Sequence, residues 1–128
     1  MSNDDKVHHI TSSAELAALM SSTTYVAVDF YADWCPPCKQ IAPVYAQLAR
    51  TGTVPGHLAF AKVNVDHVGD VAAAHGVRAM PTFKFFKAGK HVGVNGQASI
   101  QGADPRALTA AVEKLSGLAK KRAEEEAS

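Results

Sequence analysis

Strand-like and helix-like periods of hydrophobic residues alternate along most of this chain. The longest apolar run, residues 25–31, is hydrophobic on both faces except at Asp29, which is typical of a central strand covered by helices on both sides. After this run, apolar residues recur every three or four positions, which predicts a helix from Cys35 to about Arg50. Pro43 is expected to interrupt and bend this helix. The same periods predict strands at 7–10, 58–66, 82–86 and 97–101, and helices from Ser12, over 67–75 and from Pro105.

Local signals place the boundaries of the predicted domain. Ser12 followed by Glu15 is a capping box, which marks the start of the first helix. Beyond residue 118 the sequence is dominated by charged residues of both signs. We therefore expect three parts: a disordered N-terminal tail at 1–6, one domain at 7–118, and a charged tail or helix extension at 119–128.

The composition is that of an ordinary globular protein. The length of 128 residues suits one hydrophobic core, with 47% apolar and 20% charged residues. A net charge of +1 gives no bulk attraction to nucleic acid or acidic membranes. No apolar run approaches the roughly 20 residues that span a bilayer, and no secretory signal is visible. We therefore expect a cytosolic protein, with the nucleus as a second compartment, and neither nucleic acid nor membrane as a partner.

The only two cysteines, Cys35 and Cys38, lie where the run at 25–31 gives way to the following helix. A cysteine at a helix start meets unpaired backbone N–H groups and the positive end of the helix dipole, which favour the thiolate over the thiol. Cys38, one turn along, can reach back and close a small disulfide ring. Inside a cell such a pair is catalytic or metal-binding rather than a structural scaffold. The pair is therefore a candidate two-electron switch.

The sequence offers few ligands for a metal. His8 and His9 are adjacent and have no further ligands nearby, which is typical of solvated surface residues. Structural zinc takes four ligands, and no histidine lies at a matching spacing from the cysteine pair. We expect no metal site; zinc held between two chains is the alternative.

Two charged residues interrupt apolar strands. Asp29 either lies at an exposed strand end or pairs with a lysine for structure, or it is a buried acid whose raised pKa lets it handle protons near the cysteines. Lys62 either extends to the surface or faces Asp29 from the neighbouring strand. Pro81, just before the strand at 82–86, is either a structural stop or a cis proline. The residues alone leave these alternatives open.

The order of these elements and motifs resembles the thioredoxin family. The resemblance covers roughly residues 7–118 and rests on six segments: Val28–Phe30, Trp34–Lys39, Ile41–Pro43, Ala61–Asp66, Met80–Thr82 and Gly102–Ala103. It implies an α/β thioredoxin fold, in which a central mixed β-sheet of four to five strands is flanked by helices on both faces.

The resemblance implies a role for each matching residue. Cys35 is expected to be the exposed nucleophile that attacks a target disulfide, and Cys38 the buried thiol that resolves the mixed disulfide. Asp29 is expected to assist proton transfer at Cys38, with Lys62 as its neighbour. Pro81 is expected to be the family's cis proline, which packs against the cysteines and helps to present the substrate backbone.

A groove for an extended substrate peptide is also implied. Six residues are expected to bind the substrate: Trp34, Pro36, Pro37, Met80, Gly102 and Ala103. For Trp34, a role mainly in packing is the alternative.

The implied activity is the reduction of protein disulfides by dithiol–disulfide exchange. Members of the family receive electrons from thioredoxin reductase, a flavin-dependent enzyme that uses NADPH. Since this chain has no dinucleotide fingerprint, we expect a monomer with no bound cofactor, a reductase partner and disulfide-containing protein substrates. The alternatives are a binding or scaffolding module without catalysis and a more oxidising, isomerase-like exchanger.

Two features depart from the family pattern. Pro36 stands where typical thioredoxins have glycine, so that the first helical turn lacks two N–H donors while the Pro-Pro pair stiffens the ring. These effects oppose each other and leave the direction of any change in reduction potential open. The segment 89–102 is longer than the family's hairpin. We expect a tolerated turn opposite the active-site end, with a partner-specific contact as the alternative.

Overall fold

The computed structural model describes residues 6–127. The expected tail at 1–6 therefore lies outside the described residues except for Lys6, which is part of a turn. The elements in chain order are β1 Val7–Ile10, α1 Ser13–Ser22, β2 Tyr25–Tyr31, α2 Pro36–Gly52, β3 Leu58–Asn64, α3 Gly69–Ala74, β4 Thr82–Lys87, β5 Lys90–Val92, β6 Ile100–Gln101 and α4 Pro105–Ala127.

The strands form one mixed sheet in the order β1-β3-β2-β4-β5, with β6 paired to β4. β1, β3 and β2 are parallel, whereas β4 is antiparallel to β2, and β5 and β6 are antiparallel to β4. The predicted α/β class with a mixed sheet is confirmed. The sheet has six strands rather than four to five, because two very short strands, β5 and β6, both pair with β4.

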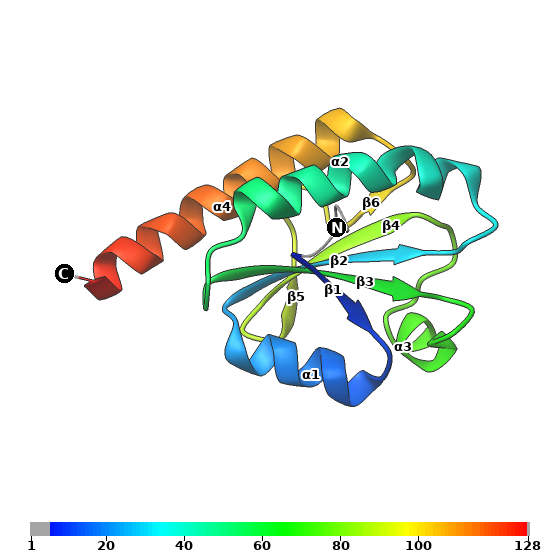
Figure 1. The fold of residues 1–128 in the computed structure, drawn as a ribbon, viewed down its shortest axis with the longest axis horizontal. Helices are drawn as coiled ribbons and strands as arrows, with labels where there is room; N and C mark the ends of the chain where they lie inside the picture. Colours follow the sequence, from blue (N-terminus) through cyan, green and yellow to red (C-terminus); the bar gives the residue numbers. More distant parts are fainter. Residues whose placement is uncertain (1–5, 128) are drawn as a thin grey trace.

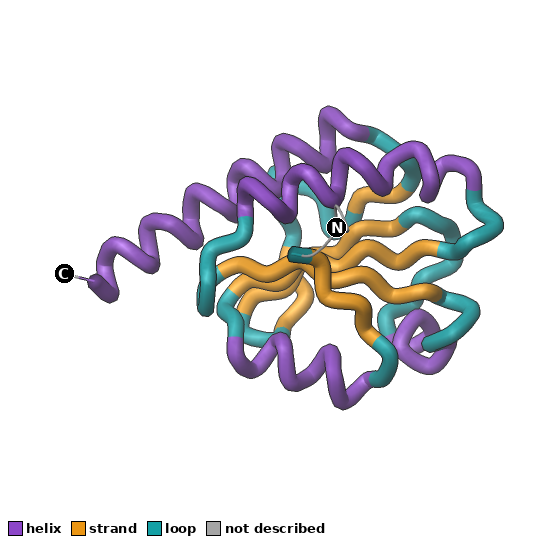
Figure 2. Tube along the Cα trace, viewed as in Figure 1, coloured by secondary structure: helices purple, strands orange, loops and turns teal. Residues whose placement is uncertain are grey.

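Helices cover both faces of the sheet, as Figures 1 and 2 show: α2 and α4 lie on one face, and α1 and α3 on the other. The two-residue period of β2 divides its side chains between two hydrophobic clusters. Ala27 packs with α2 and α4, whereas Val28 and Phe30 pack with α1 and α3. Asp29 has the parity of Ala27, so its carboxyl lies on the side of the sheet that α2 covers.

The helix starts follow the predicted capping chemistry. Ser12 Oγ accepts a hydrogen bond from the amide of Glu15 at 3.2 Å, and the Glu15 carboxylate accepts one from the amide of Thr11 at 2.9 Å. The predicted interruption at Pro43 is wrong, because α2 continues through this residue and ends at Gly52.

The segment after β4 folds differently from the prediction. Ala88 and Gly89 both adopt left-handed φ values, 51° and 79°, so this two-residue turn leads directly into β5, which the sequence did not predict. A second turn of the same kind at Asn95 and Gly96 follows. The predicted strand at 97–101 is therefore reduced to the two residues of β6.

The longer turn at 93–97 packs against α4. Val94 is buried with Leu115 in the larger core cluster, and both border a pocket beside Tyr25, the first residue of β2. The cysteines follow the opposite end of β2, so the turn lies away from them, as expected.

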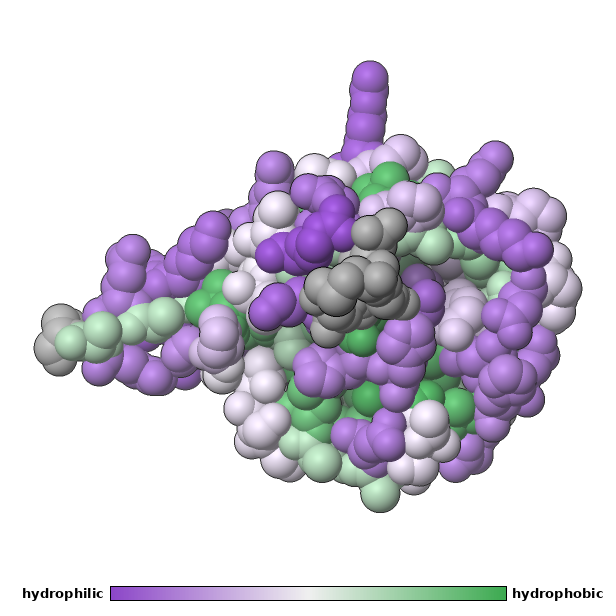
Figure 3. Space-filling model, viewed as in Figure 1, coloured by the Kyte–Doolittle hydropathy of each residue, from purple (hydrophilic) through white to green (hydrophobic). Residues whose placement is uncertain are grey.

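Helix α4 continues without a break to Ala127 and projects past the sheet in Figure 1. Ala119 is fully buried, and Ser116 Oγ donates to the carbonyl of Gly52 at 3.2 Å. Further along, Glu126 Oε1 lies 3.3 Å from His57 Nε2. The projecting end is mostly hydrophilic in Figure 3. None of the helices within residues 6–127 combines the length and apolar character needed to cross a membrane.

Tyr45 links α2 to the centre of the sheet. Its hydroxyl lies 3.0 Å from the carbonyl oxygen of Ala27 and 2.8 Å from that of Ala61, on β2 and β3. Burial raises the pKa of Tyr45 well above its ordinary value, so the hydroxyl keeps its proton and donates it.

Replacing Tyr45 with phenylalanine is expected to lower the free energy of unfolding by about 1–2 kcal/mol, since a buried donor is lost while its acceptors remain. Urea denaturation followed by circular dichroism measures this loss. Tyr25→Phe is the matched control, because Tyr25 is also buried, whereas the two hydrogen bonds to the carbonyls of Ala27 and Ala61 belong to Tyr45. Equal losses in the two variants would contradict the role of the Tyr45 hydroxyl.

Candidate active site

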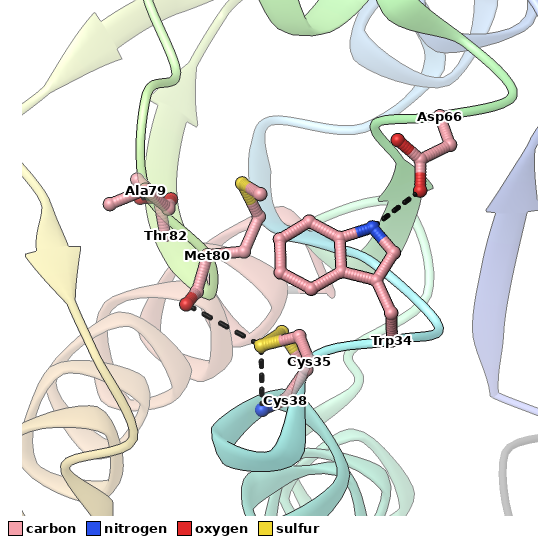
Figure 4. The surroundings of a disulfide bond; sticks show 7 residues. All are labelled: Trp34, Cys35, Cys38, Asp66, Ala79, Met80 and Thr82. Atoms are coloured by element: carbon pink, nitrogen blue, oxygen red, sulfur yellow. Dashed lines mark hydrogen bonds between the residues drawn. A yellow bond between two sulfur atoms is a disulfide. The ribbon is translucent and has the colours of Figure 1, made fainter.

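The two cysteines form a disulfide at the start of α2. Cys35 is the N-cap residue, and its Sγ accepts a hydrogen bond from the amide of Cys38 at 3.2 Å. The Cα atoms of the two cysteines are 5.2 Å apart. Pro36 and Pro37 occupy the first two helical positions, where an N–H group would have no partner within the helix. The amide of Cys38 remains the donor to the sulfur, as expected, and Figure 4 shows this contact.

The expected difference in exposure between the cysteines is wrong for this disulfide form. Cys35 was expected to be exposed, yet it is 3% exposed, and Cys38 is 5% exposed. The physical reason is that the two bonded cysteines pack against each other and in a small apolar cluster with Ala32 and Met80, which reduces the exposure of both.

Met80 and Pro81 flank the disulfide from the start of β4. The peptide bond between them is cis, so the cis alternative for Pro81 is the one observed. The carbonyl oxygen of Met80 lies 3.5 Å from Cys35 Sγ, which carries no proton in the disulfide. The amide of Gly102 donates to the carbonyl of Pro81 at 2.8 Å, and the next residue, Ala103, packs against the core. These predicted residues thus come together on one side of Cys35.

Trp34 lies on the other side of the disulfide. Its side chain is 64% exposed, so packing into the core does not explain it. The indole Nε1 donates to Asp66 Oδ2 at 2.8 Å, as Figure 4 shows. Asp66 is a site residue that sequence reasoning missed. Its position could have been predicted from the order of the strands. Because β2 and β3 are parallel and end at the same edge of the sheet, Trp34 and Asp66, which follow them, come close together.

Asp29 is buried behind Cys38. It is 2% exposed, and its Oδ1 has no hydrogen-bond partner. Burial raises the pKa of Asp29 from an ordinary 3.8 to about 7, although the positive charge of Lys62 lowers it. This environment corresponds to the buried acid among the alternatives, and it excludes an exposed strand end.

Lys62 is the register partner of Asp29 on the neighbouring strand. Its ammonium lies over the ring of Tyr31, 4.4 Å from the ring centroid, which is a cation–π contact. Lys62 thus lies on the same side of the sheet as Asp29 and is half-buried. Both alternatives for this lysine therefore hold in part: it faces Asp29, and it also reaches the surface.

A pocket of about 180 Å³ lies between the buried acid and Cys38. Asp29, Cys38 and Lys62 all contribute to its wall, as do Asp33 and Lys39. The pocket therefore borders both Asp29 and Cys38. Within residues 6–127 no group of three or more His, Cys, Asp or Glu side chains is placed to hold a metal ion.

Comparison with known proteins gives concordant matches. The model of the Thioredoxin family matches residues 6–114. A thioredoxin-like protein of Fusarium culmorum is 71% identical over 116 residues, which cover 91% of this chain and 96% of the relative. A thioredoxin of Neurospora crassa is 59% identical over 119 residues, covering 93% and 94% respectively. The solved structure of Plasmodium falciparum thioredoxin is similar with a TM-score of 0.75 at 39% identity, covering 84% of this chain and 97% of that one.

Replacing Asp29 with asparagine is expected to stabilise the oxidised protein above pH 7. Between about pH 4 and 7 the carboxyl is ionised in the unfolded chain but protonated in the folded protein, so the free energy of unfolding of the wild type falls as pH rises through this interval. The difference between 3.8 and about 7, at about 1.4 kcal/mol per pKa unit, sets an upper limit of about 4 kcal/mol.

Urea denaturation of both proteins between pH 4 and 8.5 measures this effect. The stability difference between variant and wild type should grow as pH rises from 4 to 7 and stay constant above about pH 8. A difference that does not change with pH would contradict the raised pKa of Asp29.

Proposed function

The chain belongs to the thioredoxin family and is a thiol–disulfide oxidoreductase, and from this premise we propose that it reduces protein disulfides with Cys35 as the nucleophile and Cys38 as the resolving thiol. The observation that carries this proposal is the Cys35–Cys38 disulfide at the start of α2, with a buried carboxyl behind it.

In the first step the Cys35 thiolate attacks one sulfur of a substrate disulfide. A mixed disulfide forms between Cys35 and the substrate, and the other substrate sulfur leaves as a thiolate that takes a proton from water. The amide of Cys38, 3.2 Å from Cys35 Sγ, together with the positive end of the α2 dipole, stabilises the thiolate before the attack. A thiolate with a pKa near the ambient pH is the most effective attacking group.

In the second step Cys38 attacks the mixed disulfide. Its thiol passes a proton to the Asp29 carboxylate through the pocket between them, and the resulting thiolate displaces the substrate sulfur from Cys35. Because the pKa of Asp29 is raised to about 7, this group is present in both protonation states near neutral pH and can take up and return the proton. Two electrons have passed from the dithiol to the substrate, and the protein is left in the disulfide form described here.

The substrate peptide binds between the two sides of the disulfide. Trp34 lies on one side and Met80 on the other, and Pro81, which follows Met80, accepts a hydrogen bond from the amide of Gly102. An extended chain placed between the two sides brings its sulfur to Cys35. Substrate-binding roles for Ala103 and for the exposed pair Pro36 and Pro37 are part of the proposal.

The reducing electrons come from a protein partner. The chain carries no dinucleotide fingerprint, so a flavin-dependent thioredoxin reductase that uses NADPH is the proposed donor, and no bound cofactor is needed beyond the cysteine pair. We place the protein in the cytosol, with the nucleus as a second compartment, acting as a monomer in electron transport to disulfide-containing proteins.

Replacing Cys35 with serine is expected to abolish turnover, because the attacking thiolate is gone. Cys38→Ser is expected to leave the attack intact and to accumulate a mixed disulfide, since no second thiol releases the substrate. Insulin reduction with dithiothreitol as the donor measures turnover. Non-reducing mass spectrometry of the reduced variant, mixed with insulin after dithiothreitol has been removed, detects the trapped species. Turnover retained by Cys35→Ser, or a covalent adduct formed by that variant, would rule out the assignment of the nucleophile.

The reduction potential of the Cys35–Cys38 pair distinguishes a reductase from a more oxidising exchanger. Equilibration against glutathione buffers is expected to give a value near about −270 mV. Pro36→Gly is the matched variant, because it restores the residue typical of the family and isolates the effect of the second proline. A value near about −180 mV would instead assign the protein to disulfide exchange or oxidation.

A further inference from the structure

Asn64 is a buried polar residue at the end of β3, and it is 6% exposed. Its side chain bonds in two directions. The amide Nδ2 donates to Asp33 Oδ2 at 3.2 Å, in the segment just before Cys35. The carbonyl Oδ1 accepts from the amide of Asp66 at 3.0 Å. The side chain of Asn64 thus joins the segments that follow β2 and β3.

The backbone of Asn64 also takes part in hydrogen bonds. Its carbonyl accepts from the amides of His67 and Val68, at 3.1 and 2.9 Å. The next residue, Val65, donates to the carbonyl of Tyr31 at 2.9 Å and so prolongs the ladder between β2 and β3. The turn that carries Asp66 is therefore anchored to the sheet through Asn64.

Trp34 depends on this turn for its orientation. The indole is 64% exposed, so little packing restrains it, and its Nε1–H donates to Asp66 Oδ2. Figure 4 shows the indole between Asp66 and the disulfide. Asp66 is itself exposed, and its position is set by its backbone, whose amide is bonded to Asn64.

We propose that Asn64 is a positioning residue for thiol–disulfide exchange: through Asp66 it fixes the Trp34 indole beside the Cys35–Cys38 disulfide, where the indole forms one side of the substrate site. This inference rests on the proposed function for the part that Trp34 plays in substrate binding. The placement of Trp34 by Asn64 is independent of that function.

The bonds of Asn64 also specify which side chain the position requires. The amide is a donor toward the Asp33 carboxylate and an acceptor toward the Asp66 amide. An aspartate at this position keeps the acceptor but sets a second carboxylate against Asp33. Asn64→Asp is therefore expected to retain the turn at acidic pH, where the new carboxyl is protonated, and to weaken it as that group ionises and repels Asp33. The basic side chains that line the same pocket as Asn64 are His9, Lys62 and His67.

The first readout is the fluorescence of Trp34, the only tryptophan in the chain. In the oxidised protein, Asn64→Ala and Asp66→Ala are each expected to lower the steady-state anisotropy, because the freed indole rotates faster. The double variant should show no further change, since both substitutions break one chain of contacts. Asn64→Asp should show high anisotropy at acidic pH and low anisotropy at pH 8.

The second readout is insulin reduction with dithiothreitol as the donor. Both alanine variants are expected to raise KM about five-fold and to leave kcat within about two-fold, because the indole is lost as a binding surface while the cysteines keep their positions. Ser116→Ala is the matched control, since it removes a buried hydrogen bond far from the site. It should change neither the anisotropy nor KM.

Wild-type anisotropy in Asn64→Ala would overturn the proposal, and so would an unchanged KM beside a lowered anisotropy. A lowered anisotropy in Ser116→Ala would also overturn it, because general loosening would then account for the effect. Failure of the proposed function has a different signature: the wild-type protein itself would not reduce insulin, while the anisotropy series would still decide whether Asn64 positions Trp34.

Discussion

The parallel pairing of β2 with β3 is the constraint on which the active site depends. In this register Asp29 lies beside Lys62, and Tyr31 beside Asn64. Because both strands run in the same direction, the segments that follow them leave the sheet at the same edge, one leading to Cys35 and the other to Asp66. A shift of one residue would turn Asp29 to the opposite face, away from α2 and the cysteines.

The same register buries the carboxyl of Asp29, which lowers the stability of the folded protein when this group is ionised. Asp29 lies under α2 with an unpaired oxygen, where water is largely excluded and no partner side chain compensates fully for its charge. The ammonium of Lys62 lies over the ring of Tyr31, so Asp29 is not its only contact. A fully paired carboxylate would remain ionised, so incomplete pairing is what allows burial to raise the pKa of Asp29 to about 7.

The features that could be predicted from the sequence are those that depend on a local hydrophobic pattern or on a motif. The two-sided apolar run over 25–31 and the cysteine pair after it were enough to place β2, the start of α2 and the site between them. Strand β5 escaped prediction, because its three residues are exposed or half-buried and carry no apolar period. The burial of Cys35 and the contacts of Asn64 depend on segments far apart in the chain, and no local window contains that information.

The direction of α4 has a practical consequence for attachment. The helix carries its last described turns away from the body of the protein, whereas the segment between β2 and α2 lies at the other end of the molecule in Figure 1. A linker, a tag or a solid support joined beyond α4 would leave the exposed Trp34, beside the cysteines, unobstructed. In such an attachment the helix would separate the point of attachment from the site.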